Sequence, residues 1–71
     1  MIDYYFNKHT YVLAVEGLNI RTKRFASRQA ANEEMYRIVG KKGLQLTKVY
    51  DDKHYKTYIF DGGVRIHINR E

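Results

Sequence analysis

The sequence predicts an α+β fold, in which a single antiparallel sheet of four to five strands has one helix packed on one face. Apolar and polar residues alternate over residues 64–69, apolar residues recur at helical spacing over residues 28–40, and the turn sequence DGG separates two strand-like runs. The expected order is strand–strand–helix–strand–strand, with room for one more strand at the end. Residues 1–71 are expected to form one domain, because so short a chain has no room for a second core.

The first two strands are expected to form a hairpin. Residues 10–16, TYVLAVE, are rich in β-branched and aromatic residues, and turn residues follow at 17–19. Residues 20–25 return as the second arm, and residues 4–8 are a candidate extra strand at the start. Neither face of the second arm is cleanly apolar, which is typical of an edge strand. Alternation places Arg21, Lys23 and Phe25 on one of its faces and Ile20, Thr22 and Arg24 on the other.

The helix is predicted to begin after Ser27, a good N-cap residue, and to run from residue 28 to about residue 40. Lys41 and Lys42 suit the negative end of the helix dipole, and either Gly40 or Gly43 can end the helix. The apolar stripe that faces the sheet is expected to contain Ala31, Met35 and Ile38, with Val39 beside them.

Three more segments follow the helix. Residues 44–50 are predicted to be a strand with Leu44, Leu46 and Tyr50 on one face, and residues 51–54 are predicted to be a turn. Residues 55–60 and 64–69 are predicted to be a hairpin. In its second arm Val64, Ile66 and Ile68 should face the core, and Arg65, His67 and Asn69 should face outward.

The loop length of this last hairpin decides which side chains of its first arm are buried, because a shift of one residue reverses every side chain. A two-residue loop places Tyr55, Thr57 and Ile59 in the core. A three-residue loop places Lys56, Tyr58 and Phe60 there instead. The two-residue loop is favoured, since it leaves Lys56 in water. It would gather Lys56, Tyr58, Arg65 and His67 on one outer face.

The composition indicates a basic, soluble protein. Thirteen Lys and Arg against eight Asp and Glu give a net charge of +5, which attracts anions. There is no cysteine for a disulfide or a thiolate zinc site. No apolar run approaches the ~20 residues that span a bilayer, and the N-terminus does not resemble a signal peptide. We therefore expect a cytoplasmic protein that has no contact with a membrane.

No motif indicates catalysis. His54 lies beside Asp51 and Asp52, but in a short polar turn where such residues are common. There is no His pair at the helical spacing of a hydrolytic zinc site, no G-x-S-x-G sequence, and no glycine-rich phosphate loop before a helix. We expect a protein that is not an enzyme and that holds no metal or cofactor.

Two groups of residues are candidate binding surfaces. The stretch NIRTKRFASR at residues 19–28 could bind phosphates, with the free amides at the helix start adding to the site, or it could be a solvated edge strand. The outer sheet face could stack bases next to phosphates, or its rings and cations could be ordinary cross-strand pairs. The candidate residues are Arg21, Lys23, Arg24 and Arg28 in the first group, and Lys56, Tyr58, Arg65 and His67 in the second.

The segment FASRQAANEEMYRI resembles the start of the packing helix in AP2-like N-terminal DNA-binding domains of integrases, through Phe25, Ser27 and Ala31. The size, the charge and the closing pattern KVYDDKHYKTYIFDGGVRIHINR are similar to those of small accessory proteins from phages and prophages of Gram-positive bacteria. The second resemblance implies a protein that acts in the host cytoplasm on host machinery or on host defence.

The leading hypothesis is a non-enzymatic phage-type accessory protein, of the anti-defence kind, that binds a phosphate-bearing ligand. The ligand would be a nucleic acid, or a signalling nucleotide held between the protomers of a homo-oligomer, most simply a twofold dimer. The alternative is an inhibitor that binds a host or defence protein through the Tyr-rich segment with Tyr50, Tyr55 and Tyr58. Rising salt should weaken phosphate binding steeply and leave a Tyr-rich interface largely intact.

Overall fold

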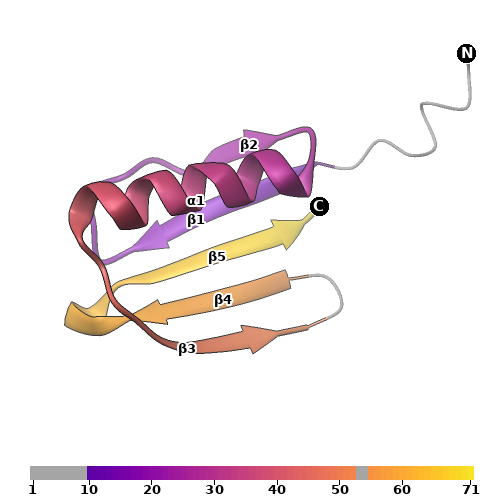
Figure 1. Ribbon diagram of the computed structural model, residues 1–71. Helices are drawn as coiled ribbons and strands as arrows, with labels where there is room; N and C mark the ends of the chain where they lie inside the picture. Colours follow the sequence, from indigo (N-terminus) through magenta and orange to yellow (C-terminus); the bar gives the residue numbers. More distant parts are fainter. Residues whose placement is uncertain (1–9, 53–54) are drawn as a thin grey trace, which may run out of the picture.

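The computed structural model describes residues 10–52 and 55–71. They form one five-stranded antiparallel sheet in the order β2-β1-β5-β4-β3, with one helix across one face (Figure 1). The predicted α+β class is confirmed. The candidate strand at residues 4–8 lies outside the described residues. The elements are β1 (Tyr11–Glu16), β2 (Lys23–Phe25), α1 (Arg28–Lys42), β3 (Leu46–Asp51), β4 (Tyr55–Phe60) and β5 (Arg65–Arg70).

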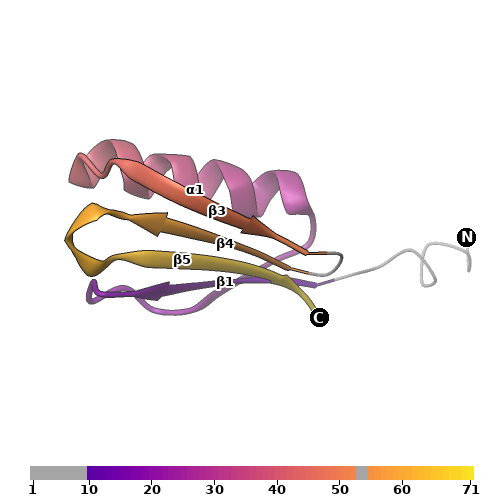
Figure 2. The same ribbon diagram turned by 90° about the horizontal axis from the view of Figure 1, so that it is seen from below.

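The core lies between α1 and the sheet. Figure 2 shows α1 on one side of the strands, which we call the helix face, and no described element on the other side, the outer face. α1 packs mainly on β1, β2 and β5, so that β3 extends beyond it (Figure 1). The predicted helical stripe and the predicted core side of β5 are confirmed. The buried core consists of Leu13, Ala31, Met35, Ile38, Tyr58, Phe60, Val64, Ile66 and Ile68.

The ends of α1 follow from its capping residues. The hydroxyl of Ser27 accepts a hydrogen bond from the Ala30 N–H at 3.1 Å, as expected of an N-cap. The helix continues past Gly40 and ends at Lys42, because Gly43 takes the left-handed conformation with φ 65° that closes a helix. The helix is therefore two residues longer than its predicted end near Gly40, and the two lysines lie in its last turn.

The favoured two-residue loop between β4 and β5 is wrong. Phe60 donates its N–H to the Val64 carbonyl at 2.8 Å, across the three residues Asp61–Gly63. Tyr58 consequently lies opposite Ile66 on the helix face. Burying the rings of Tyr58 and Phe60, which are 8% and 4% exposed, outweighs keeping Lys56 fully in water. Lys56 extends along the same face until its ammonium lies 3.6 Å from Asp51.

The predicted alternation in the strand after the helix is also wrong. A bulge separates Leu46, which pairs with Phe60 on the helix face, from Lys48, which pairs with Ile59 on the outer face. The extra residue reverses the alternation, so Val49 lies on the helix face and Tyr50 on the outer face. Leu46 and Tyr50, which were expected on one face, therefore lie on opposite faces.

Two glycines should respond in opposite ways to alanine substitution. At Gly17, with φ 91°, a Cβ atom would lie 2.6 Å from the Gly63 carbonyl oxygen, whereas at Gly40 it would meet nothing within 4 Å. We expect Gly17→Ala to lower the free energy of unfolding by about 1–3 kcal/mol. Gly40→Ala should raise it by about 0.5–1 kcal/mol, because alanine suits a helix better. Urea unfolding measures both, and equal effects of the two substitutions would contradict the close approach at Gly17.

No helix in the described parts of the chain has the length and apolar character needed to span a membrane.

Candidate anion-binding pocket

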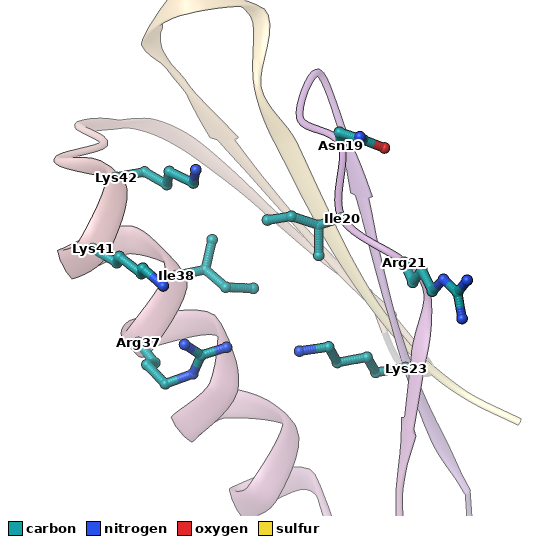
Figure 3. A pocket seen from close by; sticks show the side chains of 8 residues that line it. All are labelled: Asn19, Ile20, Arg21, Lys23, Arg37, Ile38, Lys41 and Lys42. Atoms are coloured by element: carbon teal, nitrogen blue, oxygen red, sulfur yellow. The ribbon is translucent and has the colours of Figure 1, made fainter.

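A pocket of about 360 Å³ lies between residues 19–23, which lead into β2, and the C-terminal half of α1. Figure 3 shows Ile20 and Lys23 pointing toward the helix from one side, and Arg37 and Ile38 pointing toward them from the other. The two isoleucines form an apolar floor between cationic side chains. The lining residues are Asn19, Ile20, Arg21, Lys23, Arg37, Ile38, Lys41 and Lys42.

One carboxylate at the edge of the pocket fixes two of these cations. Glu34 accepts a hydrogen bond from Arg37 Nε at 2.9 Å and another from Lys23 Nζ at 2.5 Å. These hydrogen bonds lower the pKa of Glu34 to about 2 from its ordinary value of 4.5. The bond from Arg37 has the larger effect, and the bond from Lys23 the next largest. Lys23 and Arg37 are thereby held across the pocket before any ligand arrives.

Lys41 and Lys42 add further positive charge to the pocket. Both are exposed, and neither forms an ion pair within residues 10–52 and 55–71. They lie at the carbonyl end of α1, where their charge also offsets the negative end of the helix dipole. Among the described residues, Glu34 is the one acid paired with the lining cations, so the described part of the pocket keeps a net positive charge.

The Glu34 ion pairs should make stability depend on pH. A carboxyl with a lowered pKa stabilises the fold fully above its ordinary pKa of 4.5, and this stabilisation is lost as the pH falls toward about 2. We expect the free energy of unfolding to fall more steeply over this pH range in the wild type than in Glu34→Gln. Urea unfolding across the range measures the difference, and parallel curves would show that the pairs add nothing to stability.

The predicted basic stretch is divided among three places. Lys23 points toward α1, whereas Arg21 lines the pocket but directs its guanidinium away from the helix (Figure 3). The expectation that they share a face is wrong, because the strand begins only at Lys23 and the two-residue period does not extend back to Arg21. Arg24 lies on the outer face, 3.2 Å from Glu71. Arg28 lies at the other end of α1, with its guanidinium 5.5 Å from the centre of the Tyr11 ring.

The four residues that were predicted to form the second binding surface do not lie on one face of the sheet. Lys56 and Tyr58 lie on the helix face, where Tyr58 is buried, while Arg65 and His67 lie on the outer face. His67 Nδ1 lies 3.0 Å from the Thr57 hydroxyl, and its Nε2 lies 2.7 Å from a Glu16 carboxylate oxygen. The hydrogen bond from His67 lowers the pKa of Glu16. His67 therefore links three strands within the sheet.

Sequence reasoning missed Arg37 as a pocket residue and did not join Lys41 and Lys42 to the basic hairpin. The available signal was the spacing of Arg37 to Lys41 and of Ile38 to Lys42, since residues four apart share one side of a helix. Using that signal also required knowing that the helix continues to Lys42 and that residues 19–23 lie beside it.

Within the described residues, no group of three or more His, Cys, Asp or Glu side chains could hold a metal ion. No protein-family model matches the chain, and comparisons with curated proteins and with solved structures give no match.

Proposed function

We propose that the protein binds a phosphate-bearing ligand, a signalling nucleotide, in the pocket between residues 19–23 and α1, and that it acts as a binding protein rather than an enzyme. One observation carries the proposal. The cations of Lys23, Arg37, Lys41 and Lys42 border a single concave site with an apolar floor. Lysine and arginine are the usual partners of phosphate oxygens, and an apolar floor offers contact to a base.

The electrostatics of the pocket support this ligand class. Lys41 and Lys42 are free of ion pairs within the described chain and can donate to phosphate oxygens without breaking a contact. Glu34 holds Lys23 and Arg37 in place, which reduces the conformational entropy lost on binding.

The shape of the pocket favours a nucleotide over a nucleic acid. Its volume of about 360 Å³ lies at the lower end of the range of about 300–1,000 Å³ found for small-molecule sites. A nucleic acid backbone is instead followed by a row of cations, whereas Arg24 and Arg28 lie away from this pocket. Together with the resemblance to phage accessory proteins, a nucleotide site supports a role in sequestering a host signal.

Titration calorimetry tests the proposal. The probes are a cyclic dinucleotide, a nucleoside triphosphate, duplex DNA and single-stranded RNA, each at low and at high salt. We expect saturable binding of at least one of the two nucleotides, weakening as salt rises because the contacts are charged. Absence of nucleotide binding at low salt would overturn the proposal, and tight binding of the nucleic acids alone would replace it with the nucleic-acid alternative.

A protein–protein inhibitor remains the second candidate, and exposed tyrosines favour it. Tyr50 and Tyr55 are 50% and 43% exposed, and both lie on the outer face. Tyr58, the third tyrosine of the predicted adhesive segment, is buried and cannot take part. A partner bound through Tyr50 and Tyr55 should stay bound at high salt, and replacing both by alanine should release it.

A further inference from the structure

The longer edge of the sheet is the outer edge of β3. β3 is last in the strand order, and no described residue pairs with its outer side. All six of its residues are exposed. The opposite edge, β2, has three residues, one of which is tied to Glu71 by an ion pair. Long exposed edges present backbone groups that can pair with another strand.

The hydrogen-bonding pattern shows which backbone groups face that edge. Asp52 donates its N–H to the Tyr55 carbonyl at 2.8 Å, so its backbone is directed toward β4. In an antiparallel ladder the direction alternates along the strand. The N–H and C=O groups of Tyr50 and Lys48 therefore point toward β4, and those of Asp51 and Val49 point toward the open edge.

Exposed apolar side chains lie next to the β3 edge on the helix face of the sheet. Leu46 is 53% exposed and Val49 is 40% exposed, and Tyr36 of α1 is 65% exposed. Leu46 and Tyr36 line a groove of about 140 Å³ together with Met35, Val39, Tyr58 and Phe60. Val49 pairs with Tyr58 on the same face. The groove exists because α1 leaves β3 uncovered (Figure 1). A strand added at β3 would reduce this exposed apolar surface.

We propose that β3 pairs antiparallel with β3 of a second copy of this chain, about a twofold axis at Val49, so that one sheet continues through both copies. Val49 then faces its own equivalent on the helix face, and the two residues exchange both of their edge-facing backbone hydrogen bonds. Lys48 lies opposite Tyr50 of the second copy on the outer face. This pairing is compatible with the cation–ring contact already present within the strand, where Lys48 Nζ lies 5.2 Å from the centre of the Tyr50 ring.

The charged residues of β3 and the length of the strand favour this register, and they favour a second copy of the chain as the partner of β3. An axis at Lys48 or at Asp51 would place like charges directly opposite each other, which is destabilising. An axis at Tyr50 would carry the pairing past the end of β3 at Asp51. With the axis at Val49, residues 47–51 pair among themselves, and the strand is complementary to itself. The interface uses none of the residues that line the anion-binding pocket.

Disulfide trapping tests the register, because the chain contains no cysteine of its own. Equivalent residues of a hydrogen-bonded antiparallel pair have Cα atoms about 5.5 Å apart, within the range that a disulfide spans. We expect Val49→Cys to form a covalent dimer on mild oxidation. Lys48→Cys is the matched control: in this register its two copies are offset by two residues, about 8–9 Å apart, and should not cross-link. No cross-link at Val49, or equal cross-linking at both positions, would overturn the proposal.

Sedimentation equilibrium gives a second test that needs no oxidation. The wild type should be a dimer at high micromolar concentration. Val49→Pro should be a monomer with an unchanged circular dichroism spectrum, because the N–H that it removes points to the open edge and not to β4. A monomeric wild type, or a dimeric Val49→Pro, would contradict pairing through β3.

Discussion

Replacing Met35 by alanine is expected to lower the free energy of unfolding by about 2–5 kcal/mol, the cost of truncating a long side chain in a core. Met35 is 2% exposed and lies at the centre of the stripe that α1 buries against the sheet. In so small a domain a loss of this size is a large share of the total stability. Urea unfolding followed by circular dichroism measures it.

The neighbouring residue Tyr36 provides the matched control. It is 65% exposed and lies outside the stripe that packs on the sheet. Tyr36→Ala should change the free energy of unfolding by less than about 0.5 kcal/mol, as for most surface positions. A cost for Met35→Ala as small as that of Tyr36→Ala would mean that the helix does not pack through this stripe.

The second large effect is expected on ligand affinity. Lys41→Gln combined with Lys42→Gln should weaken nucleotide binding about a hundredfold or more. Each hydrogen bond from a charged donor contributes about 1.5–3 kcal/mol, and about 1.4 kcal/mol corresponds to a factor of ten in affinity. Glutamine is a good helix former, so α1 should persist. Calorimetric titration with the nucleotide that binds the wild type measures the loss.

The control for this variant removes the same charge from another face. Arg24→Gln combined with Arg65→Gln also takes away two positive charges, but both residues lie on the outer face of the sheet. This double variant should retain nucleotide affinity within a few-fold, since only the long-range field is reduced. Equal losses in the two double variants would mean that net charge attracts the ligand and the pocket does not.

Local sequence patterns correctly predicted the buried side of those elements that keep one side toward the core along their whole length. The helical spacing of Ala31, Met35 and Ile38 and the alternation of Val64, Ile66 and Ile68 each gave the correct buried side. The start of α1 was also predictable from the local sequence, because the Ser27 side chain accepts a hydrogen bond from the Ala30 N–H in the first turn of the helix.

The errors came from places where one residue shifts the register. The three-residue connection between Phe60 and Val64 and the bulge after Leu46 each reverse which side chains are buried. Both are decided by competition between tertiary contacts. Lys56 could be accommodated on the helix face because its ammonium lies 3.6 Å from Asp51 and 5.9 Å from the centre of the Tyr58 ring. The sequence pattern gives no measure of these contacts.

The candidate site was only partly accessible from the sequence. The basic hairpin contributes Lys23 and Arg21, but the other cations that line the pocket come from the C-terminal half of α1, 14 to 19 residues beyond Lys23 in the sequence. Their proximity depends on how the helix lies over β1 and β2. The structure thereby separates Arg24 and Arg28 from a surface that the sequence alone presented as continuous.

The most direct test of the pocket is a map of the backbone amides that respond to ligand. ¹H–¹⁵N correlation spectra would be recorded while a cyclic dinucleotide, or the nucleoside triphosphate if that binds more tightly, is added to the wild-type protein at low salt. We expect the largest shifts to cluster in residues 19–23 and 37–42, on the two sides of the pocket, and to saturate together. Saturating shifts confined to the outer face of β4 and β5, or no shifts at all, would contradict nucleotide binding in this pocket.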